Sequence, residues 1–321
     1  MILSMKPPYD ITPKILALIS SISEKLGEVN AHYLSKQSPQ LRKQNRIKTI
    51  HASLSIEGNT LSEEQITALL DNKRVAGPPK DLLEVLNAFK VYEQLNAYDC
   101  FSEKSFLKAH KHLMAGLIKN AGKYRTQGVG IVKGNKVAHV APPYKLVPSL
   151  MHDLFNYLKV PEELTIIKSC VFHYEMEFIH PFADGNGRMG RLWQTLILMS
   201  AYPVFEFLPF ETLISQYQSD YYKSLAKSDK SGRSTPFIEF MLGVLNTSLE
   251  SLLTHNNWIL KDTDRLDHFI SLGLKEFTRK EYMKVFKNLS SATASRDLKK
   301  GLELKLFKSR GDKNKTQYFL K

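Results

Sequence analysis

The sequence has little cysteine and no long hydrophobic run. Its two cysteines, Cys100 and Cys170, exclude a disulfide-rich fold and are too few for a cysteine-based zinc site or an iron–sulfur cluster. No apolar run approaches the roughly 18 residues that a membrane-spanning helix needs. The first residues contain no charged segment followed by an apolar one, so no secretory signal is predicted. We therefore expect a cytoplasmic protein that does not contact a membrane.

Acidic residues are outnumbered by basic ones. The 321 residues include 32 Asp and Glu against 45 Lys and Arg, a formal charge of +13 that indicates phosphates or nucleic acid as partners. With 43% hydrophobic and 24% charged residues, the composition excludes disorder and predicts a globular protein of about two domains. Residues 261–321 contain 16 basic and 8 acidic residues, which gives +8 of the total +13. We expect a domain boundary near residue 260.

Most of the chain before this boundary has a helical pattern. Helix starts are predicted at Thr12-Pro13 and Ser38-Pro39, where a capping residue precedes a proline, and at the capping box of residues 62–65. Apolar residues recur at three- and four-residue steps in the stretches 82–92, 166–178 and 192–197. The first of these stripes is expected to face the core through Leu82, Val85, Leu86, Phe89 and Tyr92.

One segment of this part of the chain has a strand pattern instead. Val129, Ile131, Val137 and Val140 are β-formers, and Gly134-Asn135 between them is a two-residue hairpin turn signal. The sequence therefore predicts a mainly α protein, a helical bundle that carries one short β-hairpin.

The most informative stretch lies between two helical patterns, and it reads His180-Pro181-Phe182-Ala183-Asp184-Gly185-Asn186-Gly187-Arg188-Met189-Gly190-Arg191. Gly185-Asn186-Gly187 would form a loop whose N–H groups converge at the N-terminus of the next helix, and such an arrangement binds anions. Arg188 and Arg191 lie three residues apart and so share a helix face at the same end. Two guanidinium groups there would suit a polyphosphate, because arginine binds phosphate through paired hydrogen bonds.

Two further side chains of this stretch complete a set for group transfer. Asp184 is a hard oxygen ligand that can hold Mg²⁺ bridging the phosphates. His180, as an imidazole with an ordinary pKa of about 6.5, can accept a proton from a hydroxyl. The residues predict transfer of a phosphate-linked group from a Mg-nucleotide to a hydroxyl.

Three other interpretations of the stretch are weaker. Gly185, Gly187 and Gly190 match a dinucleotide fingerprint, but that fingerprint needs a preceding strand where this sequence has a helix period. His173, Glu177 and His180 could be metal ligands on one helix face, but Pro181 should end the helix and move His180 off that face. This favours His173 as an ordinary core or surface histidine. A mere Gly-capped turn with solvated charges would require eight specified residues to coincide by chance.

These residues resemble, without a gap, the Fic family motif His-Pro-Phe-x-(Asp/Glu)-Gly-Asn-Gly-Arg-x-x-Arg. The similarity covers about residues 40–250. The hairpin after Tyr124-Arg125-Thr126 sits where the family has its target-binding flap, and Tyr221-Tyr222 sits where the family has adenine-side tyrosines. The resemblance implies a Fic-type bundle that transfers AMP from ATP to a Ser, Thr or Tyr hydroxyl of a protein and releases pyrophosphate.

The resemblance also assigns roles to single residues. His180 would be the catalytic base, Asp184 the Mg²⁺ ligand and Phe182 the anchor of the loop in the core. Nucleotide binding is implied for Gly185, Asn186, Gly187, Arg188, Gly190, Arg191, Val129, Gly130, Ile131, Val132, Tyr221 and Tyr222. The implied substrate and cofactor are ATP and Mg²⁺. Unknown target proteins would dock on the flap, whose edge can accept an extended segment as an extra strand, unless the hairpin is only a connection.

A second motif, Ser53-Leu54-Ser55-Ile56-Glu57-Gly58, resembles the inhibitory helix of the family, (Ser/Thr)-x-x-x-Glu-(Gly/Asn). Glu57 would lie in the last helical turn, before a glycine that can take the left-handed C′ position. A carboxylate there opposes the helix dipole, and a cation would relieve the conflict. The resemblance names Arg191 as that cation, so the motif residues Ser53, Glu57 and Gly58 are predicted to be inhibitory, with ATP bound poorly or with its α-phosphate misaligned. The alternative is an ordinary surface glutamate at a capped helix end.

The C-terminal segment, residues 262–321, predicts two helices, a turn, a third helix and a hairpin. Helices are expected to start near Thr278 and Ser291, and a basic loop spans residues 311–315. This pattern resembles a winged helix-turn-helix, which would place the last helix in a major groove and the loop on the backbone. The candidate DNA contacts are Arg296, Lys299, Arg310 and Lys313, with Lys315 beside them. A protein-interaction module is the alternative.

The predicted organisation has three parts. Residues 1–100 are N-terminal helices with the inhibitory motif 53–58, residues 101–255 are a Fic catalytic core with the flap 124–143 and the motif 180–191, and residues 262–321 are the winged helix-turn-helix-like domain. The predicted function is a protein adenylyltransferase, autoinhibited by Glu57, whose target could be the chain itself. The alternative is a nucleotide-sensing, DNA-binding transcriptional regulator. A different transferred group, such as phosphate, UMP or phosphocholine, and a homodimer both stay open.

Overall fold

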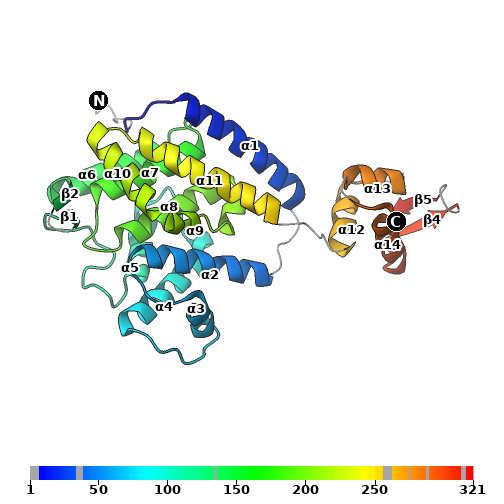
Figure 1. Ribbon diagram of the computed structural model, residues 1–321, viewed down its shortest axis with the longest axis horizontal. Helices are drawn as coiled ribbons and strands as arrows, with labels where there is room; N and C mark the ends of the chain where they lie inside the picture. Colours follow the sequence, from blue (N-terminus) through cyan, green and yellow to red (C-terminus); the bar gives the residue numbers. More distant parts are fainter. Residues whose placement is uncertain are drawn as a thin grey trace. The chain divides into compact units, whose positions relative to one another are not determined.

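The computed structural model describes residues 7–33, 39–133, 136–255, 262–274, 276–286, 289–311 and 316–320. They fall into two compact units, the first ending at Leu253 and the second beginning at Thr254. The chain is mainly helical, as predicted (Figure 1). Within the described ranges, no helix is long and apolar enough to span a membrane.

The first unit is helical apart from one hairpin. Its helices are α1 (Pro13–Tyr33), α2 (Pro39–Ile56), α3 (Glu63–Leu70), α4 (Pro79–Glu93), α5 (Glu103–Leu113), α6 (Val147–Leu158), α7 (Thr165–Ile179), α8 (Asn186–Ala201), α9 (Glu211–Gln216), α10 (Gln218–Ser231) and α11 (Thr235–His255), with short 3₁₀ turns η1 (Leu95–Ala97), η2 (Tyr144–Leu146) and η3 (Pro203–Glu206). The predicted start of α1 and the capping box of α3 are confirmed: Ser62 Oγ accepts a hydrogen bond from the N–H of Gln65.

The helix α8 lies in the interior of this unit, packed against α7 (Figure 1). All its residues from Arg188 to Leu198 are buried. The indole N–H of Trp193 donates to the carbonyl oxygen of Cys100 (3.0 Å). A helix buried all round is found in the core of a larger domain, so the site residues on α8 have a rigid support.

The predicted core stripe of α4 is only partly correct. Val85 and Tyr92 are buried, but Leu86 is 38% exposed. Leu86 follows Val85 by one residue, which is a rotation of about 100° around the helix axis. This rotation places Leu86 at the edge of the buried face of α4.

The predicted hairpin is confirmed by its two described strands, β1 (Gly130–Lys133) and β2 (Lys136–Val140). They pair antiparallel, with Gly130 opposite Val140, Lys133 opposite Lys136 and an irregularity after Ile131. The predicted turn residues, Gly134 and Asn135, lie outside the described residues. β2 contacts α10, so the hairpin packs onto the helical unit along this strand.

The second unit has its own small core. It contains α12 (Asp262–Ser271), β3 (Glu276–Thr278), α13 (Arg279–Val285), α14 (Ser291–Glu303), β4 (Phe307–Arg310) and β5 (Gln317–Leu320), with the strands in the antiparallel order β3-β5-β4. Its core includes Leu266, Phe269, Phe277, Tyr282 and Phe307. The sequence did not predict β3, because three residues are too few to show a strand period. The winged-helix interpretation stays a prediction.

His110 of α5 anchors the loop between α7 and α8. Its ring stacks on Phe182, with 3.5 Å between the ring centroids and 5° between the planes. Nδ1 accepts a hydrogen bond from the N–H of Gly122 (2.8 Å), so the neutral ring carries its hydrogen on Nε2, which donates to the carbonyl oxygen of Asp184 (3.0 Å). Burial lowers the pKa of His110 to about 4. The loop is thus held by a histidine that the folded chain keeps neutral.

We expect the free energy of unfolding to fall as the pH is lowered from about 6.5 to about 4. An unfolded histidine takes up its proton near pH 6.5, whereas folded His110 does so only near pH 4, so the unfolded chain binds more protons in this window. The loss due to His110 should approach about 3 kcal/mol. Urea unfolding between pH 8 and pH 4 measures it.

The control for this measurement is His110→Gln, which keeps a donor for the Asp184 carbonyl but does not titrate. Its stability should decline less steeply than that of the wild type below pH 6.5. Some decline remains, because burial also lowers the pKa of His173 to about 3. Equal slopes for the two proteins would contradict the assignment to His110.

Candidate functional site

The predicted site lies where α7 ends and α8 begins. α7 ends at Ile179, and His180 follows in the left-handed conformation (φ +50°), which residues with a Cβ rarely adopt. The N–H of His180 donates to the carbonyl oxygen of Met176 (3.0 Å). The helix therefore stops before Pro181, as predicted, and His180 leaves the helix face on which His173 lies.

Asn186 closes the loop that follows His180. Its Oδ1 accepts from the N–H of Phe182 (2.9 Å), and its Nδ2 donates to the carbonyl oxygen of the same residue (3.0 Å). Phe182 is fully buried. The side chain of Asn186 thus bonds to the loop itself, and any contact of this residue with a ligand would come through its backbone.

The helix α8 begins earlier than the predicted loop suggests. Gly185 is its N-cap, with φ +85°, and a Cβ there would lie 2.7 Å from Met114 Sδ. Asn186 and Gly187 are therefore already in the first helical turn. The N–H groups of a first turn have no acceptor within the helix, so this end of α8 is suited to bind an anion.

Arg191 of α8 is fully buried and bonds to α2. Its Nε donates to Ser53 Oγ (3.0 Å), and its Nη2 donates to the carbonyl oxygen of Ser53 (2.9 Å) and to Glu57 Oε1 (2.7 Å). Although burial disfavours the charge, the Glu57 carboxylate holds the pKa of Arg191 above its ordinary value. The structure thus brings Arg191 into contact with Ser53 and Glu57 of the second motif.

The Glu57 carboxylate also lies against the first turn of α8. A Cβ placed on Gly187 would be only 2.2 Å from Glu57 Oε1, so the carboxylate reaches the backbone where an anion would bind. Glu57 follows the end of α2, and Gly58 turns the chain away with φ +91°. Gln218 of α10 donates to the carbonyl oxygen of Ile56 (2.9 Å), which holds the end of α2 in place.

Arg188 bridges two carboxylates. It is buried, with Nη1 donating to Glu84 Oε1 (2.9 Å) and Nη2 donating to Asp184 Oδ1 (3.0 Å). Asp184 Oδ1 also accepts from the N–H of Gly185 (2.6 Å), while the side chain stays 47% exposed. Sequence reasoning missed Glu84, whose only signal is an acidic residue beside the apolar stripe of α4.

Two residues assigned to nucleotide binding have other surroundings. Tyr221 is buried, and its hydroxyl lies 3.1 Å from His173 Nε2. A Cβ on Gly190 would lie 2.7 Å from the ring of His173, so this glycine lets α8 pack closely on α7. Both residues face the core in this structure, and their contact with a nucleotide stays a prediction. Tyr222, in contrast, is 40% exposed.

His173 is a core histidine, as the sequence favoured. It is fully buried, and its Nδ1 lies 2.6 Å from Gln194 Oε1. Burial lowers its pKa to about 3. Among the residues that the structure describes, no group of three His, Cys, Asp or Glu side chains is arranged to hold a metal ion by itself.

The other predicted residues lie in the flap and in the second unit. Val129 precedes β1, and Gly130, Ile131 and Val132 belong to it. Arg296 and Lys299 are exposed on α14, and Arg310 is exposed at the end of β4. Lys313 and Lys315 lie outside the described residues.

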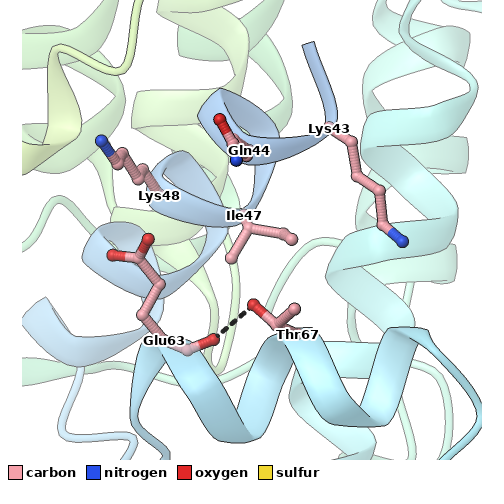
Figure 2. Close-up of a pocket in the computed structure, with 6 residues that line it drawn as sticks. All are labelled: Lys43, Gln44, Ile47, Lys48, Glu63 and Thr67. Carbon is pink, nitrogen blue, oxygen red and sulfur yellow. Dashed lines mark hydrogen bonds between the residues drawn. The ribbon is translucent and has the colours of Figure 1, made fainter. Parts of the chain in front are cut away.

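A cleft of about 470 Å³ between α2 and α3 is distinct from this set of residues. Figure 2 shows it lined by Lys43, Gln44, Ile47 and Lys48 of α2 and by Glu63 and Thr67 of α3. The Thr67 hydroxyl donates to the carbonyl oxygen of Glu63 (2.8 Å). None of the predicted site residues is among these six, so the cleft does not mark the candidate site.

The chain is similar to known proteins over most of its length. The Fic/DOC family matches residues 100–198. Protein adenylyltransferase fic-1 of Caenorhabditis elegans is 27% identical over 271 residues, which are 75% of this chain and 51% of that protein. Protein adenylyltransferase Fic of Nematostella vectensis is 28% identical over 260 residues, 75% of this chain and 58% of that protein. The chain thus spans little more than half the length of these curated relatives.

A crystal structure of a Fic family protein from Desulfovibrio desulfuricans G20 is similar over nearly the whole of both chains. It is 41% identical, with a TM-score of 0.76, and the match covers 99% of this chain and 98% of that one. The match therefore includes the second unit as well as the helical one. On this identity and coverage, together with the loop between α7 and α8, the chain belongs to the Fic family.

Proposed function

We propose that the chain is a protein adenylyltransferase, which transfers AMP from Mg-ATP to a Ser, Thr or Tyr hydroxyl of a protein. The observation that carries the proposal is one loop that holds His180 and a half-exposed Asp184 at the N-terminus of α8, with Arg191 about one and a half turns along the same helix. The two curated relatives, both protein adenylyltransferases, support the same reaction.

In the proposed reaction, His180 accepts the proton of the target hydroxyl. The hydroxyl oxygen bonds to the α-phosphorus of ATP, the bond from that phosphorus to the bridging oxygen breaks, and pyrophosphate leaves. The first-turn N–H groups of α8, at Gly187 and Arg188, would stabilise the charge on the phosphate oxygens. The edge of the flap would hold the target as an added strand.

The residues present fit a Mg²⁺ ion that is shared with the substrate. Asp184 offers a half-exposed carboxylate whose Oδ1 is fixed by the N–H of Gly185 and by Arg188. Mg²⁺ is usually held by one or two carboxylates, while phosphates and waters supply the other ligands. Bound Mg²⁺ would neutralise phosphate charge. Because Glu84 already balances the charge of Arg188, we assign Arg188 the task of orienting Asp184.

We also propose that Glu57 inhibits the chain. Ser53 of α2 and Glu57, which follows α2, accept hydrogen bonds from Nε and Nη2 of Arg191. The third nitrogen, Nη1, is buried and has no hydrogen-bond partner among the described residues. The carboxylate of Glu57 also lies against Gly187. A γ-phosphate would therefore compete with Glu57 for the guanidinium and for the same end of α8.

Replacing Glu57 with glycine should raise the rate of AMP transfer at least about tenfold, a change equivalent to about 1.4 kcal/mol. The substitution removes the carboxylate that would compete with the nucleotide for the guanidinium of Arg191. The measurement is incorporation of label into protein from ATP labelled at the α-phosphate, with Mg²⁺ and with a cell lysate as the source of targets.

Two variants control this experiment. Glu57→Gly/His180→Ala should incorporate no label, because the base is gone. Glu64→Gly removes an exposed glutamate from the first turn of α3, away from Arg191, and should behave as the wild type. Equal labelling of wild type and Glu57→Gly would contradict inhibition by Glu57. No label in any sample, with ATP bound, would favour a nucleotide-sensing regulator.

As a second function, we propose that the C-terminal unit binds duplex DNA. On α14, Ala294, Asp297 and Leu298 are buried, whereas Arg296 and Lys299 are exposed on the opposite face. A helix that presents basic side chains in this way can enter a major groove. The net charge of +8 in residues 261–321 supports a polyanionic partner, since the same segment carries 16 basic and 8 acidic residues.

Binding to a DNA duplex of mixed sequence should weaken as salt is raised. Arg296→Ala and Lys299→Ala should each reduce the slope of log K against log salt concentration by about 0.9. Lys300→Ala is the matched control, because Lys300 lies on the same helix but pairs with Asp262 (2.8 Å). An affinity that does not change with salt would contradict phosphate contacts.

A further inference from the structure

Arg125 lies buried at the base of the flap, in contact with the loop that carries His180, and only 5% of it is exposed. Its guanidinium donates only to backbone carbonyl oxygens within the described part of the chain. These are the oxygens of His180 (from Nε, 2.7 Å), Ile179 (from Nη2, 3.3 Å), Pro142 (from Nη2, 2.5 Å) and Gln127 (from Nη1, 2.9 Å). The backbone N–H of Arg125 donates to the carbonyl oxygen of Pro181 (2.8 Å).

One side of this cluster is the C-terminal end of α7. The last carbonyl groups of a helix lack partners within it and carry the negative end of the helix dipole. Ile179 and His180 supply such carbonyls, so the cation of Arg125 is stabilised there without a carboxylate. Burial lowers the pKa of Arg125, but an arginine stays charged at any physiological pH. The contact also stabilises the left-handed conformation of His180. Such a conformation costs free energy and persists only where neighbouring contacts hold it.

The other side of the cluster is the base of the flap. Gln127 lies three residues before β1, and Pro142 lies two residues after β2. A single side chain therefore joins both ends of the hairpin and ties them to the backbone of His180. Arginine suits this task because its planar guanidinium offers five N–H donors in fixed directions, whereas lysine offers one nitrogen.

We propose that Arg125 is a positioning residue that fixes the flap relative to His180, so that a hydroxyl held on the flap meets the base. The inference rests on the proposed adenylyl transfer. Arg125 does not contact the nucleotide end of the site, which Asn186, His110 and Arg188 hold through separate hydrogen bonds. Loss of Arg125 should therefore impair transfer to the acceptor far more than it impairs ATP binding.

The test compares Arg125→Gln and Arg125→Lys in the full-length Glu57→Gly chain. The matched control is Lys168→Gln. Lys168 is also a buried cation of the same region, located on α7, and its Nζ donates to one backbone carbonyl, that of Leu158 (2.9 Å). A general effect of losing a buried cation would appear in both Gln variants, whereas loss of the flap contact would appear only at position 125.

The first readout is hydrogen exchange of backbone amides, which needs no activity. In Arg125→Gln, the amides of β1 and β2 should exchange at least about tenfold faster, while those of α8 change less than about threefold. Lys168→Gln should leave exchange in the flap unchanged. If Arg125→Gln does not fold, Arg125→Lys takes its place, since it keeps the charge and can still reach one or two of the carbonyls.

The second readout is AMP transfer at increasing ATP concentration. We expect kcat to fall at least about thirtyfold in Arg125→Gln with KM for ATP within about threefold, and Arg125→Lys to recover part of the loss. Unchanged flap exchange, a rate within about threefold of the parent, or an equal loss in ATP binding would overturn the inference. Faster flap exchange with no label from the Glu57→Gly parent would support the flap contact and overturn adenylyl transfer.

Discussion

The first unit depends on the hydrogen bonds and the ion pair that the fully buried guanidinium of Arg191 makes. Removing one partner of a buried ion pair costs about 3–5 kcal/mol, because the other charge is then left without compensation. Arg191 meets this requirement with Ser53 and Glu57, and so α2 is bound to the interior helix α8 by electrostatics as well as by packing. If α2 moves away, Arg191 needs another anion. A bound nucleotide could supply one, and this is why the position of α2 and the occupancy of the site would be linked.

The loop between α7 and α8 is held almost entirely by its backbone. Asn186 bonds to Phe182, His110 bonds to the carbonyl of Asp184, and Arg125 bonds to the carbonyl of His180. These contacts come from three separate parts of the chain and hold the backbone of the loop at His180, Phe182 and Asp184. The loop therefore has a fixed shape, although two of its residues, His180 and Gly185, adopt left-handed conformations. Preorganisation of this kind is what proton transfer and phosphate binding require.

Local patterns in the sequence predicted the features that are local in space. The capping box of residues 62–65, the end of α7 before Pro181 and the β-hairpin follow from short stretches of chain, and the structure has them. The pairing of Glu57 with Arg191 spans 134 residues and came only from the family resemblance. Features set by packing between distant elements were missed, such as the roles of Glu84 and His110 and the burial of Tyr221. No periodicity in one helix reports which side chain of another helix will face it.

The close approach of the Glu57 carboxylate to Gly187 limits how this protein can change over evolution. Any side chain at position 187 would push the carboxylate away, because a Cβ there would lie 2.2 Å from Oε1. The same side chain would also fill the space over the first turn of α8 where a phosphate would bind. Under the proposed inhibition, a chain that escapes it by mutation while keeping its site must therefore change Glu57 or α2 and leave α8 intact. The glycine should persist in active and in restrained descendants alike, whereas the glutamate can be lost only where another anion, such as a bound nucleotide, takes its place beside Arg191.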